Sequence, residues 1–395
     1  MKILIADKMS SGVVKELEKL GGAVSVQADL TENDLPGAIK DFEVLIVRST
    51  KVNKKTIEAG ASLSLIIRAG AGVNTIDLET ASSHGVHVAN CPGRNTDAVA
   101  ELAIGLLIAA DRRIAQASRD LQAGKWRKKE YEKAFGLKDR TLGILGVGSI
   151  GKAVTKIAQG MNMKVAAWSR SLSKEKAEAL GVIFCATPLD VAIQSDAVSI
   201  HLAAKPETTK LVNESFLSKM KNGAILINTS RGEVVDTAAL KKAIKEKNLR
   251  VGLDVYEGEP AGGEAEFKDT ELAAMTVGTP HIGASTEQAS EAIAAHVVEI
   301  VRSYKEKGKP ENTVNIRKET TAKKTLVVRH FNKVGVMAGV LDRLREADVN
   351  IEEMENTIFT GGTAASCTLL LDSEPSAEIL AQIGKDKNIM QVSLK

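Results

Sequence analysis

Cysteine is scarce in this chain, and its few occurrences are scattered. Only three occur among the 395 residues, at Cys91, Cys185 and Cys367, and no CxxC pair is present. A thiolate metal site needs clustered cysteines, so the sequence argues against one, and we expect no bound metal. Dispersed cysteines also suit a reducing compartment.

Long apolar runs and secretory signals are missing as well. No run approaches the roughly 18 residues that a membrane-spanning helix needs. Residues 1–6, MKILIA, pass directly into an apolar strand pattern without the anatomy of a signal peptide. We therefore expect a cytoplasmic protein with no membrane partner.

Neither sign of charge is in large excess. Lysine plus arginine total 53 and aspartate plus glutamate total 50, which leaves a formal net charge of +3 at pH 7. The sequence has no long basic block and no basic stripe interleaved with aromatic residues, so we expect no nucleic-acid partner. A hydrophobic fraction of 44% and a charged fraction of 26% are typical of a soluble globular protein. The length predicts two or three domains.

The most informative segment that is present is GVGSIG at residues 146–151, with glycines at Gly146, Gly148 and Gly151 and with Ser149 and Ile150 between them. An apolar run precedes it, and a helical pattern follows at residues 152–159. A strand, a tight glycine turn and a helix N-terminus together predict a seat for a dinucleotide pyrophosphate. Free backbone N–H groups and the helix dipole face the negative charge there.

Short apolar segments alternate with helical patterns over the first 283 residues. The expected strands are residues 3–6, 44–47, 65–68 and 86–89, and then 143–146, 164–168, 197–201, 224–228 and 252–255. Such alternation predicts an α/β fold with two doubly wound parallel-sheet domains. Between them, Thr96 can cap a long helix over residues 97–122.

The last part of the chain has a different order of elements. A polar, charged stretch at residues 317–324 is typical of a linker. Beyond it, strand patterns at residues 325–328, 350–360, 364–372 and 389–394 enclose helical patterns at 336–347 and 376–384. The order βαββαβ predicts a ferredoxin-like domain over residues 325–395.

Three segments after expected strands carry side chains suited to redox chemistry on a hydroxy acid. Arg231 follows an apolar strand and can grip a carboxylate through two parallel N–H bonds. His281 can act as an acid in reduction and as a base in oxidation, and a nearby carboxylate such as Glu259 would stabilise the imidazolium. Ligands of open α/β sheets bind at the carboxyl ends of the strands, which is where these residues are expected.

These motifs together resemble the D-isomer-specific 2-hydroxyacid dehydrogenases, and within that family the phosphoglycerate-oxidising members. The similarity runs over nearly the whole chain. It includes VRS at 47–49, RAGAGV at 68–73, NCPG at 90–93, VAE at 99–101, the glycine turn, TSRG at 229–232, LDV at 253–255, EP at 259–260 and PHIG at 280–283.

The resemblance implies roles for particular residues. Arg231, Glu259 and His281 would be catalytic, with Glu259 preferred to Glu257 because it precedes Pro260. Residues 96–283 would bind the dinucleotide, and residues 1–95 with 284–316 would bind substrate. Beside the glycine turn, the implied cofactor contacts are Ser169, Arg170, His201, Thr229, Asp254 and Gly283. The implied substrate contacts are Arg48, Ser49, Ala71, Gly72, Val73 and Asn90, and a neighbouring subunit would add one of Arg127, Lys128 and Lys129.

The sequence departs from the family pattern after the glycine turn. Where an NAD-binding fold usually has an acid for the ribose 2′-hydroxyl, this chain has Ser169 followed by Arg170. Serine cannot repel a 2′-phosphate and arginine attracts one, so we expect NAD as cofactor with NADP tolerated. Ala203 stands where the family usually has proline, which puts the local backbone geometry in question.

The C-terminal segment resembles an ACT domain, a small-molecule sensing module. His330, Asn332 and Asn350 match the residues that hold an amino acid between paired domains of serine-regulated relatives, although Val334 replaces a usual proline. The resemblance therefore implies L-serine as an effector and a homodimer or homotetramer as the assembly.

The leading prediction is oxidation of 3-phospho-D-glycerate to 3-phosphohydroxypyruvate, the first step of L-serine biosynthesis. A glyoxylate or hydroxypyruvate reductase is a second possibility that Ser169 and Arg170 would suit. From a different class, a cofactor-sensing binding protein like the corepressors that share this fold stays open, because a fold alone does not fix a function.

Overall fold

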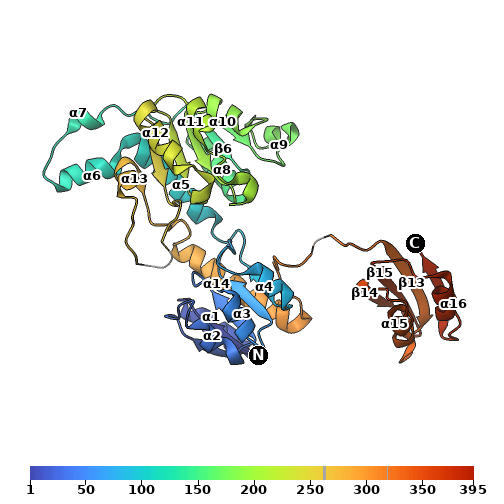
Figure 1. Cartoon of the computed structure of the whole chain (residues 1–395). Helices are drawn as coiled ribbons and strands as arrows, with labels where there is room; N and C mark the ends of the chain where they lie inside the picture. The colour runs from blue at the N-terminus through green and yellow to red at the C-terminus, as the bar shows by residue number, and fades with distance from the viewer. Residues whose placement is uncertain (261–263, 318) are drawn as a thin grey trace. The chain divides into compact units, whose positions relative to one another are not determined.

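The computed structural model describes residues 1–260, 264–317 and 319–395. Its contacts divide the chain into two compact units, Met1–Asn315 and Ile316–Lys395, shown in Figure 1. Residues 261–263, within the range expected to bind the dinucleotide, and residue 318, within the expected linker, lie outside the described residues.

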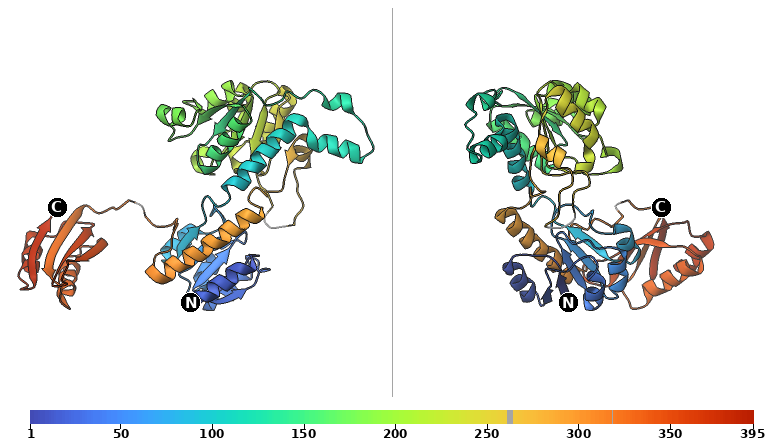
Figure 2. Two further views of the ribbon diagram at one scale, coloured as in Figure 1. Left: turned by 180° about the vertical axis from the view of Figure 1, so that it is seen from behind. Right: turned by 60° about the vertical axis from the view of Figure 1, so that its left-hand side comes forward.

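The first sheet of the larger unit has five parallel strands in the order β2-β1-β3-β4-β5. Its strands are β1 (Lys2–Ile5), β2 (Ala23–Val26), β3 (Val44–Val47), β4 (Leu65–Arg68) and β5 (His87–Asn90). Its helices are α1 (Ser11–Lys19), α2 (Leu35–Ala38), α3 (Lys54–Ala59), α4 (Leu78–Ser83) and the later α14 (Glu287–Lys307). Alternate strand residues point to opposite faces of the sheet and form two hydrophobic cores. One core lies against α1 and α14, and the other lies against α2, α3 and α4. Figure 2 shows α14, in orange, beside the blue elements of this sheet.

The second sheet has seven parallel strands in the order β12-β11-β10-β9-β6-β7-β8. They are β6 (Thr141–Leu145), β7 (Lys164–Trp168), β8 (Ile183–Phe184), β9 (Ala197–Ile200), β10 (Ile225–Asn228), β11 (Arg250–Leu253) and β12 (Val277–Gly278). Helices α5 (Thr96–Arg112) and α8 (Ser149–Gly160) cover one face. On the other face lie α10 (Pro188–Gln194), α11 (Glu214–Lys219) and α12 (Thr237–Lys247). Strand order reverses between β6 and β9, and open α/β sheets bind ligands at such a switch point.

The prediction of two doubly wound parallel sheets is confirmed, but the single long helix over residues 97–122 is wrong. Helix α5 ends at Arg112, and α6 (Ile114–Gln122) begins after Arg113, whose φ of 53° is left-handed. A residue in that conformation breaks the helical hydrogen-bond ladder, so the chain changes direction there. Short helices follow at α7 (Lys128–Tyr131), α9 (Lys174–Ala179) and α13 (Thr270–Met275).

The smaller unit is a four-stranded antiparallel sheet in the order β14-β15-β13-β16. Its elements are β13 (Lys324–Phe331), α15 (Val336–Glu346), β14 (Ile351–Ile358), β15 (Ala364–Leu371), α16 (Ala377–Gly384) and β16 (Ile389–Leu394). This order matches the predicted βαββαβ arrangement. Leu326, Val328 and Leu369 of the sheet pack with Leu344 and Ile383 of the two helices in one core.

Candidate active site

The glycine turn lies at the switch point of the second sheet. Gly146 follows β6 with a φ of 99°, and a Cβ atom there would collide with the carbonyl of His201. A Cβ atom at Gly151 would collide with the carbonyl of Gly146, so helix α8 packs directly on the turn. Gly148 is the N-cap of α8 and has no atom within 4 Å of the place where its Cβ would stand. The turn therefore presents the free N–H groups of Ser149, Ile150 and Gly151 at an open helix end.

A cavity of about 410 Å³ adjoins this turn. Five residues predicted to bind cofactor line it, namely Gly146, Gly148, Ser169, Arg170 and His201. Sequence reasoning missed the rest of the lining, which is Val147, Trp168, Pro188, Leu202, Ala203, Lys205, Glu207, Thr208 and Leu211. Several of these follow β9, so the rule that ligands bind at strand carboxyl ends is the signal that points to them.

His201 is held in its neutral form within this lining. Its Nε2 atom lies 2.9 Å from Ser199 Oγ, and its buried Nδ1 atom has no hydrogen-bond partner among the described residues. Burial lowers the pKa of His201 to about 4, because a charged ring there would lose its hydration. Thr229, another predicted cofactor residue, likewise has a buried Oγ1 atom unpartnered in the described part of the chain. A dinucleotide thus fits this site, which offers an open helix end, a cavity and polar atoms without partners.

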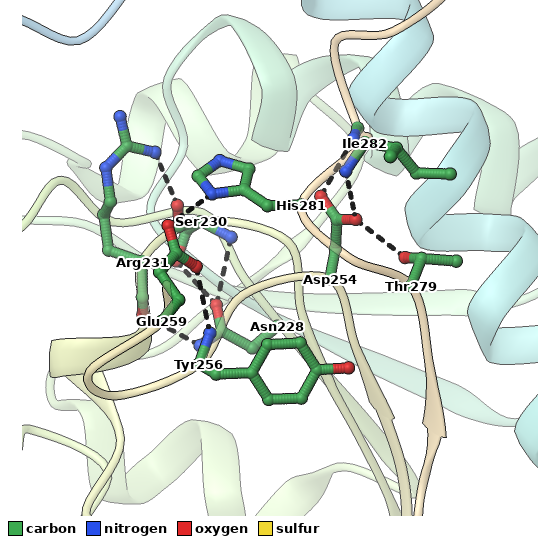
Figure 3. Close-up of polar contacts among 10 residues, drawn as sticks. Asn228, Ser230, Arg231, Asp254, Tyr256, Glu259, Thr279, His281 and Ile282 are labelled. Atoms are coloured by element: carbon green, nitrogen blue, oxygen red, sulfur yellow. Dashed lines mark hydrogen bonds and ion pairs between the residues drawn. The ribbon is translucent and has the colours of Figure 1, made fainter. Parts of the chain in front are cut away.

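Arg231, Glu259 and His281 meet at the carboxyl end of the same sheet, from the segments after β10, β11 and β12 (Figure 3). His281 Nδ1 lies 2.5 Å from Glu259 Oε1, and the Tyr256 N–H donates to Glu259 Oε2 at 3.4 Å. Burial works to raise the pKa of the Glu259 carboxyl, but the hydrogen bond and charge of His281 and the charge of Arg231 hold it below its usual value. Glu257 instead pairs with Lys210 at 3.7 Å, which agrees with the preference for Glu259.

Arg231 is fixed beside its own strand. Asn228 Nδ2 donates to the Arg231 carbonyl at 2.9 Å, and Arg231 Nη1 donates to the Ser230 carbonyl at 2.6 Å. A Cβ atom at Gly72 would collide with Arg231 Nη2. The guanidinium therefore reaches the loop after β4, where substrate contacts were predicted.

Asp254 anchors the loop that carries His281. Its carboxylate accepts hydrogen bonds from Thr279 Oγ1 at 2.7 Å and from the N–H groups of Ile282 and Gly283 at 2.8 and 2.9 Å. The His281 N–H donates to the Asp254 carbonyl at 2.8 Å, and His281 has a left-handed φ of 53°. Asp254 is 1% exposed, so the structure gives it an anchoring role, and its predicted contact with the nicotinamide stays a prediction.

A third arginine, Arg68, joins Arg48 and Arg231 near this site and was not among the predicted site residues. Burial lowers the pKa of the Arg68 guanidinium, and the charges of Arg231 and Arg48 lower it further. Its Nε atom is buried without a hydrogen-bond partner in the described residues. A Cβ atom at Gly70 would collide with the guanidinium, so the glycine makes room for it. The position of Arg68 at the carboxyl end of β4 is the signal that sequence reasoning left unused.

The other predicted substrate residues line the same loops. Asp7 Oδ2 accepts from the N–H groups of Arg48 and Ser49 at 2.7 and 3.1 Å and so holds the segment after β3. Asn90 Nδ2 donates to the Ala71 carbonyl at 2.5 Å, which links β5 to residues Ala71, Gly72 and Val73. Asn90 thus supports the loop against which Arg231 lies.

The predicted effector residues of the smaller unit do not come together within one chain. His330 is 2% exposed, and its ring nitrogens contact the Phe331 carbonyl at 2.8 Å and Asn356 Oδ1 at 3.1 Å. Asn332 Nδ2 donates to the Gly362 carbonyl at 2.9 Å, at the same end of the sheet. Asn350 precedes β14 at the opposite end, where its N–H donates to Asp372 Oδ1 at 3.0 Å. A ligand that contacts all three must lie between copies of the chain.

Across residues 1–260, 264–317 and 319–395, every helix is too short or too polar to cross a bilayer. Over those same ranges, no group of three or more His, Cys, Asp or Glu side chains is placed to hold a metal ion. Cys91, Cys185 and Cys367 are buried and unpaired.

Comparison with known proteins agrees with this geometry. Residues 104–283 match the family described as D-isomer specific 2-hydroxyacid dehydrogenase, NAD binding domain. A D-3-phosphoglycerate dehydrogenase of Methanocaldococcus jannaschii is 34% identical over 375 residues, which cover 94% of this chain and 70% of that protein. A glyoxylate reductase of Thermococcus litoralis is 39% identical over 286 residues, which cover 70% of this chain and 85% of that protein. Other curated relatives are longer, and the chain spans 53% of one from Synechocystis.

Among solved structures, the NAD⁺-bound 3-phosphoglycerate dehydrogenase of Entamoeba histolytica superposes with a TM-score of 0.66 at 28% identity. The match covers 80% of this chain and 99% of that one. The family inferred from the sequence motifs and the NAD cofactor are confirmed. The chain belongs to the D-isomer specific 2-hydroxyacid dehydrogenases and is an NAD-dependent oxidoreductase of that family.

Proposed function

We propose that this enzyme oxidises 3-phospho-D-glycerate to 3-phosphohydroxypyruvate. The observation that carries the proposal is the gathering of Arg48, Arg68 and Arg231 around one site. The substrate carries a carboxylate and a phosphate, and each is best held by guanidinium groups that make charge-assisted hydrogen bonds. Three guanidinium groups suit a substrate with two anionic groups better than one with a single carboxylate. The similarity to phosphoglycerate dehydrogenases supports the same choice.

The chain's own residues supply binding and proton transfer. NAD, held at the glycine turn of residues 146–151, would supply the acceptor for the hydride that leaves C2 of the substrate. Arg231 binds the carboxylate and fixes the reacting carbon, while Arg68 and Arg48 hold the phosphate. His281 Nε2 takes the proton of the C2 hydroxyl, because Nδ1 is engaged by Glu259. Glu259 stabilises the resulting imidazolium, and in the reverse direction His281 returns the proton to the carbonyl oxygen.

Each part of the chain takes one role in this proposal. Residues 96–283 bind NAD, and residues 1–95 with 284–316 bind the substrate. Residues 325–395 form the regulatory domain beyond the linker at 317–324. The division of contacts at Asn315 and Ile316, next to that linker, supports a regulatory unit that folds as a separate body.

A glyoxylate or hydroxypyruvate reductase is the second candidate, favoured by the relatives of those names that are 39% identical to this chain. A cofactor-sensing binding protein is disfavoured, because such a protein has no need for the short His281–Glu259 contact beside a guanidinium.

Initial rates with 3-phosphoglycerate, hydroxypyruvate and glyoxylate, each with its matching NAD form, test the proposal. We expect the highest kcat/KM for 3-phosphoglycerate. Loss of a charge-assisted bond costs roughly 1.5–3 kcal/mol, so Arg68→Met should lower that value by about 10- to 150-fold. The rate with glyoxylate should change less than about threefold if the lost bond is to phosphate. A wild-type enzyme that prefers glyoxylate, or an equal loss with both substrates, would contradict the assignment.

The proposed assembly is a homodimer or homotetramer with L-serine as effector. Trp126, between α6 and α7, is 81% exposed, and Leu121 of α6 is 58% exposed. Large apolar side chains exposed in one copy are explained if a second copy covers them in the assembly. In this assembly, a neighbouring subunit would complete the substrate site with a cation from Arg127, Lys128 or Lys129. Arg127 in this structure pairs with Asp120 at 3.6 Å. Sedimentation velocity tests the assembly, and a monomer at all concentrations would refute it.

Serine binding needs two copies to bring Asn350 near Asn332. An equilibrium titration with L-serine should show uptake that Asn332→Ala abolishes. No uptake by the wild-type enzyme, or uptake that the substitution leaves unchanged, would remove the effector role.

A further inference from the structure

The strand that follows the glycine turn ends without an acid. Strand β7 ends at Trp168, and Ser169 and Arg170 continue into the cofactor cavity. An acid at this point normally accepts a hydrogen bond from the ribose 2′-hydroxyl of NAD and repels the 2′-phosphate of NADP. A free Arg170 would instead attract that phosphate.

Arg170 is not free in the structure. Its Nη1 atom lies 2.7 Å from Oε1 of Glu207, which also lines the cavity. Glu207 lies in a different segment from Arg170, the short helix Pro206–Thr208 that follows β9. Its own backbone N–H group, and the charges of Arg170 and Lys205, hold the pKa of the Glu207 carboxyl below its usual value, so it is ionised at neutral pH.

The segment that carries Glu207 is well fixed. The Lys205 N–H donates to Thr208 Oγ1 at 2.9 Å, and that hydroxyl donates to the Ala203 carbonyl at 2.6 Å. Thr208 is 7% exposed, which anchors the turn in the core. The Glu207 carboxylate therefore lies at the cavity on a turn that these hydrogen bonds hold in place.

We infer that Glu207 determines coenzyme selectivity in this enzyme, taking the place of the acid that Ser169 lacks. A 2′-phosphate that binds Arg170 must separate it from Glu207, and it then lies beside a carboxylate whose remaining cationic neighbour is Lys205. Like charges at short range cost binding energy, and NAD meets neither penalty. NAD is therefore preferred and NADP is bound weakly. The inference rests on the proposed binding of NAD by residues 96–283, with the adenosine ribose at the end of β7 where this fold usually has its acid.

Calorimetric titration of the full chain with NADH and with NADPH tests the inference without any substrate. We expect wild type to bind NADH at least about tenfold more tightly than NADPH, and Glu207→Gln to tighten NADPH binding by about tenfold, equivalent to about 1.4 kcal/mol. In the double variant Glu207→Gln/Arg170→Ala that gain should be smaller, because the guanidinium is absent and only the relief of repulsion remains. The gain should also shrink at high salt, since the site is exposed.

Glu214→Gln is a matched control, because Glu214 forms an exposed 2.7 Å pair with Lys242 and does not line the cavity. It should leave both dissociation constants within about twofold, as is usual for surface substitutions. An unchanged NADPH constant in Glu207→Gln would overturn the role of Glu207, and an equal gain without Arg170 would overturn the part assigned to the ion pair. If wild type binds neither coenzyme, the position of the coenzyme is itself wrong, and both proposals fall. If Glu207→Gln leaves NADPH unchanged while NADH still binds, only the selectivity inference fails.

Discussion

His281 Nδ1 and Glu259 Oε1 lie 2.5 Å apart, although the two residues are 22 positions apart in the chain and follow different strands. The contact orients the ring and leaves Nε2 as the nitrogen that faces a ligand. It also places a carboxylate where an imidazolium would form.

Replacing His281 by asparagine should remove proton transfer and keep coenzyme binding. General acid–base catalysis contributes about 10²–10⁴-fold, so we expect kcat in His281→Asn to fall within that range. The dissociation constant for NADH, measured by titration, should stay within about twofold of wild type. His84→Asn makes the same chemical change at the C-cap of helix α4 and serves as the control. Full turnover in His281→Asn would remove the histidine from the mechanism.

Replacing Glu259 by glutamine should change the pH dependence. The folded-state pKa of Glu259 lies below the usual 4.5, so its charge stabilises the folded pair above about that pH, and the stabilisation is lost as pH falls through the lowered value. A neutral amide no longer favours the imidazolium. The pH of half-maximal oxidation should therefore move lower in Glu259→Gln, with a loss of kcat of about tenfold or more. Identical pH profiles of kcat for the two enzymes would show that the carboxylate has no part in the proton transfer.

Asp254→Asn should destabilise the His281 loop. The asparagine amide places one NH2 group where one carboxylate oxygen stood, so the N–H group of either Ile282 or Gly283 loses its acceptor, at a cost of about 1–3 kcal/mol. The midpoint of urea unfolding should fall by the corresponding amount, and kcat should fall because His281 is displaced. Asp139→Asn, an exposed control in the same sheet domain, should stay within about 0.5 kcal/mol. Equal midpoints for Asp254→Asn and wild type would contradict the anchoring role.

His201 should stay neutral well below the usual range of histidine. Its pKa of about 4 compares with 6.5 for an unperturbed group, so its NMR resonance should move only below about pH 5. Between those values the unfolded chain binds a proton that the folded chain does not. This group therefore lowers the free energy of unfolding by up to about 3 kcal/mol as pH falls through that window. His201→Asn should flatten that part of the stability curve, and a resonance that titrates near pH 6.5 would refute the prediction.

The parts of the fold that follow from short-range patterns could be read from the sequence. Gly146 and Gly151 mark the turn because only glycine fits against the His201 and Gly146 carbonyls. The break at Arg113 could not be predicted, since arginine favours helices and its left-handed φ is imposed by tertiary context.

Only some features of the candidate site could likewise be predicted from the sequence. Arg231 and His281 follow strands, so a rule about strand ends places them together. The ion pair of Arg170 with Glu207 joins residues 37 apart whose side chains meet only in the folded sheet. No periodicity in the sequence specifies which acid in a loop faces a given arginine.

The close approach of Arg231 to Gly72 has a consequence for protein engineering. A side chain supplied by one half of the larger unit occupies space that the other half leaves vacant by having no β-carbon. Chimeras that graft the first 95 residues of a relative onto this coenzyme-binding half therefore keep Arg231 in its present position only with glycine at the matching site. A donor with alanine there would displace the guanidinium of Arg231, the group proposed to bind the substrate carboxylate.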